Sequence, residues 1–284
     1  MPEVPRRLTV ACVQLNAGAD LTAGIEAAAA WVREAAARGA ELIGLPEYFS
    51  QLCLREKHLQ LEVFEAEDAH PAMPVMRTLA AELGVGVLLG SIPVRAPDGR
   101  AFNRSILLGP DGRIVARYDK IHLFDVNLGP GETYRESDVI APGGRAVVAE
   151  MPWGRLGLSI CYDLRFPHLY RDLAKAGAEI LAVPAAFTRT TGQAHWHVLL
   201  RARAIENGAF VMAPAQCGVH GDGVTYGHAL IVDPWGRILA EAGETPGIIL
   251  AELDLDRVRQ ARSRVPSLGH DRPYARPGGV STDG

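Results

Sequence analysis

Three residues of types that can carry out nucleophilic catalysis each follow or end a strand-like run of the sequence. Glu47 follows ELIGLP, Lys120 ends RIVARYDK, and Cys161 follows RLGLSI. In α/β folds, ligands bind beyond the carboxyl ends of strands, where we expect these side chains. A cysteine thiolate can attack a carbonyl carbon, a carboxylate can accept the thiol proton, and an ammonium group can stabilise the oxyanion. Each residue alone is typical of a surface charge or a buried thiol, so only their combination indicates chemistry.

The segment around Cys161 is typical of a nucleophile elbow. In GLSIC, which starts at Gly157, Cys161 stands at the final glycine position of the G-x-S-x-G pattern. A strand, a sharp turn and then a helix from about Arg165 would lift the Cys161 side chain clear of the sheet. We expect the nearby helix start to lower the pKa of the thiol. Ser159 lacks the flanking pattern of a serine nucleophile, and we expect it to point into the core.

The elements that must position these residues repeat one pattern, in which an amphipathic helix is followed by a glycine and a short apolar strand. Apolar residues at helical spacing predict helices within residues 21–38, 76–83, 166–176 and 196–207. Asp20 is a favourable N-cap for the first of them. The strands that follow are continuous apolar runs, which predicts that both of their faces are covered.

Hairpin turns interleave with this pattern. PDG at residues 97–99 and 110–112, and DPWG at residues 233–236, each separate two strand-like runs. The expected fold is a mixed α/β sandwich with its helices outside. Because no clear linker or repeat interrupts the chain, we expect residues 1–275 to form one domain and residues 276–284 to form a loose tail.

The composition excludes several classes of protein. The 284 residues are 48% hydrophobic and 22% charged, which is ordinary for a globular chain. A net charge of −4 carries no electrostatic signature of binding to nucleic acid or to an anionic membrane. No apolar run approaches the ~18 residues that span a bilayer. The four cysteines form no CxxC pair, which argues against a disulfide framework or a zinc site and favours a cytoplasmic location.

Four short motifs together resemble the nitrilase, or carbon–nitrogen hydrolase, superfamily. They are LPEYF around Glu47, YDKIHLFD around Lys120, YRES around Glu136 and SICYDLRFP around Cys161. The resemblance extends over roughly residues 7–275. It implies a four-layer αββα sandwich, a homodimer or larger homo-oligomer, and no metal or organic cofactor.

The resemblance also implies a role for each matching residue. Cys161 would be the nucleophile and Glu47 the general base. Lys120 and the backbone N–H of Tyr162 would hold the oxyanion, and Glu136 would orient the lysine and the substrate. The implied reaction converts an amide and water into a carboxylate and ammonia or an amine, through a thioester. Two carboxylates beside one lysine should keep the lysine charged and raise the pKa of at least one carboxylate.

Longer segments indicate a branch of the superfamily. SICYDLRFPHLY, PAAFTRTTGQAHW and RARAIEN resemble the deaminated glutathione amidases most, and the omega-amidases of 2-oxoglutaramate and 2-oxosuccinamate are the alternative. Both branches act on amides of small anionic 2-oxo acids, so an arginine near the nucleophile is expected. Arg165 is the candidate, because its planar fork can hold a carboxylate at two points; pairing with Asp163 is its structural alternative. The resemblance also implies that Phe187 and Thr191 line the pocket.

Some features depart from this branch or leave other functions open. Tyr48 stands where close relatives often have Asn, and the loop NLGPGETYRES differs from the commoner version, so the substrate is less certain than the class. Tyr162 replaces the Trp that usually follows the cysteine of true nitrilases, which argues against nitrile hydrolysis. N-carbamoyl amide hydrolysis would release carbon dioxide as well as ammonia. Isochorismatase-like hydrolases lack the DPWG hairpin and the second glutamate, and a non-enzymatic scaffold would usually have lost a catalytic residue.

The remaining cysteines and histidines indicate no further chemistry. His195 and His197 are two apart on a predicted helix, so they point to different faces and make a poor metal pair. We expect no metal site. The roles of Cys53 and Cys217 stay open, and Cys217 could approach the pocket from its loop.

Overall fold

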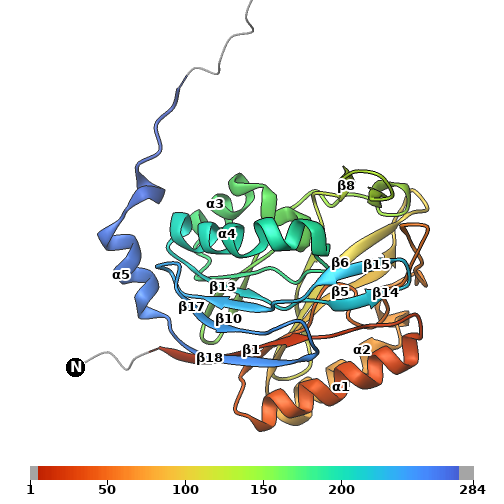
Figure 1. Ribbon diagram of the computed structural model, residues 1–284. Helices are drawn as coiled ribbons and strands as arrows, with labels where there is room; N and C mark the ends of the chain where they lie inside the picture. Colours follow the sequence, from red (N-terminus) through yellow and green to blue (C-terminus); the bar gives the residue numbers. More distant parts are fainter. Residues whose placement is uncertain (1–5, 275–284) are drawn as a thin grey trace, which may run out of the picture.

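Two six-stranded sheets pack face to face, with one pair of helices outside each sheet (Figure 1). The structure is a computed structural model and describes residues 6–274. The predicted αββα sandwich is therefore confirmed. The predicted tail, residues 276–284, lies outside the described residues, and the single domain stays a prediction.

The first sheet mixes a parallel centre with antiparallel edges. Its strands, in spatial order, are β18 (Gly247–Asp254), β1 (Arg7–Gln14), β2 (Leu42–Gly44), β5 (Gly86–Arg95), β6 (Ala101–Leu108) and β7 (Ile114–Asp119). The pairings β1–β2 and β2–β5 are parallel, and the other pairings are antiparallel. The two PDG turns join β5 to β6 and β6 to β7, as predicted.

The second sheet repeats this plan. Its strands, in spatial order, are β10 (Val147–Met151), β11 (Gly154–Leu158), β12 (Ile180–Ala182), β13 (Phe210–Ala213), β16 (Leu230–Val232) and β17 (Ile238–Glu241). The pairings β11–β12 and β12–β13 are parallel. Three small hairpins lie apart from both sheets: β3 (Leu54–Arg55) with β4 (His58–Leu59), β8 (Asp125–Asn127) with β9 (Thr133–Arg135), and β14 (Cys217–His220) with β15 (Gly223–Tyr226).

All four predicted helices are present, but the second begins at Ala72 and the fourth at Arg189, four and seven residues earlier than predicted. The helices are α1 (Leu21–Ala37), α2 (Ala72–Leu83), α3 (Pro167–Lys175), α4 (Arg189–Asn207) and α5 (Asp256–Arg264). Asp20 caps α1, since its side chain accepts a 3.0 Å hydrogen bond from the N–H of Ala23. Short 3₁₀ helices cover Glu67–Ala69, Glu136–Asp138, Cys161–Arg165 and Ser267–Gly269.

Alternation along β1 explains why its sequence is apolar throughout. Val10 and Cys12 are buried in the cluster that fills the space between the sheets, whereas Ala11 and Val13 are buried in the cluster beneath α1 and α2. A strand with both faces covered needs apolar residues at every position. The helices lie outside the two sheets in Figure 1, with α1 and α2 on one side and α3 and α4 on the other.

Candidate active site

The motif residues come from both sheets and meet in one cavity. Glu47 follows β2 and Lys120 follows β7, both in the first sheet, whereas Cys161 follows β11 in the second sheet. Glu136 begins the 3₁₀ turn after β9. All four residues line the same cavity, as the resemblance to the family implies. The two sheets therefore have to pack in one register for the site to exist.

The ammonium group of Lys120 is held between two carboxylates. Its Nζ donates a 2.9 Å hydrogen bond to Oε1 of Glu47 and 2.9 Å hydrogen bonds to both carboxylate oxygens of Glu136. The three residues are at most 4% exposed, so water does not screen these charges. Burial by itself lowers the pKa of Lys120, but the two carboxylates outweigh it and hold that pKa well above its ordinary value. Lys120 therefore stays charged, as predicted.

Asn103 joins the two carboxylates, although the sequence analysis did not single it out. Its Nδ2 lies 2.9 Å from Oε1 of Glu47 and 3.3 Å from Oε1 of Glu136. Backbone groups complete the fixation, because the N–H of Ala186 donates to Glu47 at 2.8 Å and the N–H of Phe124 donates to Glu136 at 2.6 Å. Each carboxylate is thus held in one orientation while facing the cavity. An asparagine inside a strand carries no sequence signal for such a role.

Cys161 lies on a strained turn, as the elbow pattern predicts. Its φ is +49°, in the left-handed region that side chains rarely adopt. Its backbone N–H is occupied by the carbonyl of Pro184 at 2.9 Å, whereas the N–H of Tyr162 has no hydrogen-bond partner within residues 6–274. The segment after Cys161 differs from the prediction: residues Cys161–Arg165 form a 3₁₀ turn, and the α-helix begins at Pro167. Proline is well suited to the first turn of a helix, which explains the later start.

The expected pKa of the thiol was wrong in direction. Burial, followed by the charge of Glu47, raises the pKa of Cys161 well above its usual value, and the opposing effect of Lys120 is smaller. The prediction considered the helix start and omitted burial and the nearby carboxylates. Burial and Glu47 also raise the pKa of Glu136, although Lys120 opposes them, so the prediction that at least one carboxylate has a raised pKa is confirmed. The thiol therefore needs a base before it can attack.

Asp163 ties the turn of Cys161 to the segment that carries Lys120. Its carboxylate accepts hydrogen bonds from the hydroxyl of Tyr118 at 2.6 Å, from the N–H of Ile160 at 2.9 Å and from the N–H of His122 at 3.0 Å. The Nδ1 of His122 lies 2.7 Å from the same carboxylate. Asp163 is fully buried and pairs with these groups, not with Arg165. The link sets the position of Lys120 relative to Cys161.

The rest of the cavity is mainly apolar and carries two cations in addition to Lys120. Its apolar lining includes Leu52, Leu54, Leu59, Phe124, Val224 and Phe187. Thr191, like Phe187 a predicted pocket residue, also lines it. The cations are Lys57 and Arg135, which the sequence analysis did not name.

Arg165 lies beside two residues that line the cavity. Its guanidinium carbon is 5.6 Å from the ring centroid of Tyr162 and 5.2 Å from that of Phe187, and its Nη1 is 3.2 Å from Nδ1 of His195. Arg165 does not belong to the lining described above, whereas both rings do. In the structure, Arg165 is thus placed to support two rings of the pocket.

The other thiols and the nearby serine stay apart from the cavity lining. Ser159 is buried, and its Oγ bonds the hydroxyl of Tyr170 and the carbonyl of Ala182, both at 2.7 Å. Cys217 is buried on β14, and Cys53 is partly buried. Neither lines the cavity.

Within residues 6–274, none of the helices combines the length and the apolar character that crossing a bilayer requires.

A buried cysteine, a lysine and two glutamates at the floor of one cavity define a cysteine-dependent hydrolase of carbon–nitrogen bonds. Residues 9–263 match the carbon-nitrogen hydrolase family, and the chain belongs to that family and to the nitrilase superfamily. The chain is 45% identical over 265 residues to a protein of Synechocystis named deaminated glutathione amidase, an alignment that covers 92% of this chain and 96% of the relative.

Two solved structures share the fold. Saccharomyces cerevisiae Nit3, a member of branch 10 of the nitrilase superfamily, superposes with a TM-score of 0.80 at 31% identity, covering 92% of this chain and 94% of that one. The C. elegans NitFhit protein superposes with a TM-score of 0.84 at 35% identity. The match covers 94% of this chain but only 65% of the NitFhit chain.

Replacing Glu47 by glutamine should lower the pKa of Cys161. The substitution removes a negative charge that raises this pKa and leaves the positive charge of Lys120 in place. The rate at which iodoacetamide alkylates Cys161, followed by peptide mass mapping across pH, should therefore rise at lower pH in Glu47→Gln than in the wild type. Glu150→Gln, an exposed substitution on β10, is the matched control. An unchanged or upward-shifted profile in Glu47→Gln would contradict this electrostatic account.

Proposed function

We propose that the cavity hydrolyses the amide of a small anionic 2-oxo acid derivative, with deaminated glutathione as the preferred substrate. The observation that carries the chemistry is the Lys120 ammonium, fixed between Glu47 and Glu136 in the cavity that Cys161 lines. Such a centre supplies a nucleophile, a base and an oxyanion donor without any further group.

The first half-reaction transfers the acyl group to Cys161. Glu47 accepts the thiol proton while the sulfur attacks the carbonyl carbon, and the carbonyl oxygen becomes an oxyanion. Lys120 and the unoccupied N–H of Tyr162 stabilise that oxyanion. The carbon–nitrogen bond then breaks, and the proton on Glu47 passes to the leaving nitrogen. The products of this step are a thioester on Cys161 and a free amine or ammonia.

The second half-reaction releases the acid. Glu47, ionised again, takes a proton from water while the water oxygen attacks the thioester carbon. The same donors hold the second oxyanion. The carbon–sulfur bond breaks, the sulfur recovers the proton from Glu47, and the carboxylic acid leaves. The raised pKa of Cys161 supports this sequence, because a thiol that is protonated at neutral pH needs the base in the first step and holds the proton after the last.

Glu136 and Asn103 act as positioning residues for the two catalytic charges. Glu136 accepts hydrogen bonds from Lys120 with both of its carboxylate oxygens. The side-chain amide of Asn103 donates hydrogen bonds to both Glu47 and Glu136. An oxyanion donor works only if it stays where the charge develops, and losing one donor typically costs about 10²–10³ in rate. The network therefore keeps Lys120 from swinging away when the substrate arrives.

Two observations support an anionic substrate of this branch. The family relative in Synechocystis carries the name deaminated glutathione amidase. In addition, Lys57 and Arg135 place positive charge at the cavity wall, where a substrate carboxylate can bind away from the buried glutamates. Within residues 6–274, the Arg135 side chain has no hydrogen bond or ion pair, so its donors are available. The omega-amidase reaction and N-carbamoyl hydrolysis use the same centre and are the alternatives.

We further infer that the protein works in the cytoplasm as a homodimer or larger homo-oligomer, without a cofactor in its active site. Four free cysteines fit a reducing compartment. Val198 and Ile205 project from α4 with 67% and 54% of their surface exposed, which supports a covered face in an assembly.

The substrate assignment can be tested by offering deaminated glutathione and 2-oxoglutaramate side by side. Both yield 2-oxoglutarate when the amide is cleaved, so one assay of that product compares kcat/KM directly. We expect a clear preference for deaminated glutathione, and no turnover by Cys161→Ala, whose fold circular dichroism should show intact. Preference for 2-oxoglutaramate would show that the protein catalyses the omega-amidase reaction instead. Substantial turnover by Cys161→Ala would show that Cys161 is not the nucleophile.

The carboxylate-binding residue can be tested with two arginine substitutions. Because Arg135 lines the cavity and Arg165 does not, Arg135→Gln should raise KM for the anionic substrate by about tenfold, the value of one hydrogen bond to a charged group. Its kcat should change little, and KM for a neutral amide should not change. Arg165→Gln should affect kcat and KM together for both substrates, because it loosens the rings of Tyr162 and Phe187. If only Arg165→Gln raised KM selectively for the anionic substrate, Arg165 and not Arg135 would be the residue that binds the substrate carboxylate.

A further inference from the structure

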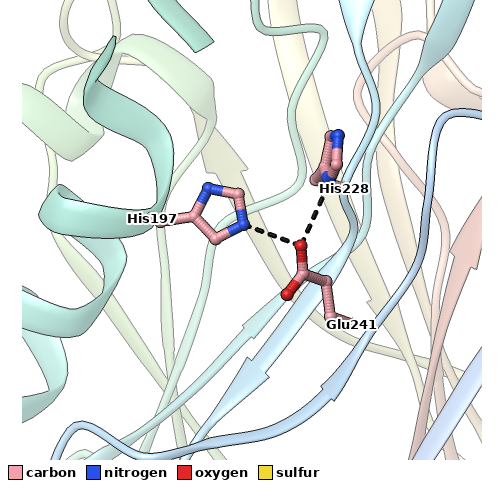
Figure 2. A group of neighbouring side chains, drawn as sticks. All are labelled: His197, His228 and Glu241. Carbon is pink, nitrogen blue, oxygen red and sulfur yellow. Dashed lines mark hydrogen bonds and ion pairs between the residues drawn. The ribbon is translucent and has the colours of Figure 1, made fainter. Parts of the chain in front are cut away.

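Two histidines and a glutamate converge on one point outside the active-site cavity (Figure 2). His197 lies on α4, His228 precedes β16, and Glu241 ends β17. Oε1 of Glu241 lies 2.9 Å from Nε2 of His197 and 3.0 Å from Nδ1 of His228. Figure 2 shows both rings directed at this carboxylate from different elements. None of the three residues lines the active-site cavity.

The donor set suits a divalent transition metal. Two imidazole nitrogens and one carboxylate oxygen form a three-ligand set that zinc uses, with water in the fourth position. Imidazole also favours zinc over magnesium or calcium, which prefer oxygen ligands. The side chains are between 21% and 34% exposed, so an ion can enter from solvent. One carboxylate beside two neutral imidazoles leaves a net charge of −1 for the cation.

The two nitrogen–oxygen distances are close to the ligand separation of a tetrahedral site. Zn–N and Zn–O bonds of about 2.0–2.1 Å place two tetrahedral ligands about 3.3 Å apart. The two nitrogen–oxygen distances are a few tenths of an ångström shorter than this, and all the donor atoms lie within 4.8 Å of one another. Binding of an ion therefore requires rotations of these partly exposed side chains that bring the two nitrogens closer together.

The position of His228 is set by its surroundings before any ion binds. Its φ is +55°, in the left-handed region that a non-glycine residue rarely adopts. The indole of Trp196 donates to its carbonyl at 2.8 Å, and its own N–H donates to Gly243 at 3.1 Å. The ring of Tyr226 stacks on the imidazole with centroids 4.3 Å apart. Backbone and ring are thus fixed together with the donor atom aimed at Glu241.

We propose that His197, His228 and Glu241 bind one Zn²⁺ ion per chain, which cross-links helix α4 to the β16–β17 hairpin. Nε2 of His197 and Nδ1 of His228 coordinate as neutral imidazoles, and Glu241 coordinates through its carboxylate. The site is structural: it fixes α4, whose first turn carries Thr191 at the cavity wall, against the second sheet. It is independent of the proposed amide hydrolysis.

The test is direct binding of Zn²⁺ to the full chain after treatment with a chelator. Isothermal titration should give one site per chain in the wild type, and saturating Zn²⁺ should raise Tm by several degrees, since a ligand that binds the folded state stabilises it. His197→Gln and Glu241→Gln should each weaken binding by about 100-fold, because loss of even a supporting group costs 10–100-fold. Both variants should also lose the Tm increase.

His195→Gln is the matched control, because it removes a histidine two residues away on the same helix that does not face Glu241. It should bind Zn²⁺ as the wild type does. Titration with Co²⁺ distinguishes this site from metal binding at a cysteine. A cysteine ligand would give an intense thiolate charge-transfer band, whereas the proposed site should give none. Absence of a stoichiometric site in the wild type, or undiminished binding in His197→Gln and Glu241→Gln, would overturn the proposal.

Discussion

The buried ammonium of Lys120 is the constraint on which the site depends. Removing an ion from water costs free energy unless opposite charges and hydrogen bonds replace its hydration. If one partner of a buried ion pair moves away, the other is left as an uncompensated buried charge, which is strongly destabilising. Here the replacement comes from Glu47 and Glu136, which stand on different segments. Each carboxylate is in turn fixed by a backbone N–H and by Asn103. The catalytic charges are thus parts of one network that forms only when the sheets are packed.

The balance of charge in this network explains the state of the thiol. Two carboxylates surround a single lysine, so the cavity floor carries excess negative charge beside Cys161. That excess, added to burial, keeps the sulfur protonated until a carbonyl group arrives. In this respect the centre differs from cysteine sites in which a histidine or a helix start produces a stored thiolate. Here activation and attack belong to one step.

Sequence reasoning succeeded where local patterns carry the information. The helix–glycine–strand repeat, the hairpin turns and the motif residues Glu47, Lys120 and Cys161 all have signals within a few positions of the chain. The continuous apolar strands, whose two faces are both buried, predicted a sandwich with its helices outside, and the resemblance to a family supplied the four-layer αββα arrangement. The resemblance to a family supplied Glu136, which has no distinctive local pattern of its own.

What the sequence could not predict depends on contacts through space. Asn103 and Asp163 act through side chains that meet only after the sheets pack, and neither has a characteristic neighbourhood. Arg135 lines the cavity because a small hairpin places it there, whereas Arg165, which is closer to Cys161 in the sequence, contacts the ring of Phe187 and does not line the cavity. The pair His195 and His197 was correctly seen as divergent, but the partners of His197 lie 31 and 44 positions later, in the β16–β17 region. The prediction of the pKa of Cys161 failed for the same reason, because the burial of the thiol and the charged groups near it are set by the fold.

The account's central claim is that catalysis passes through a thioester on Cys161. Rapid quenching of the enzyme during turnover of deaminated glutathione, followed by peptide mass mapping, tests it most directly. The account predicts that the peptide containing Cys161 carries the acyl part of the substrate, without the leaving amine, and that hydroxylamine removes it. An acyl group on another residue, or steady turnover with Cys161 never modified, would contradict the account.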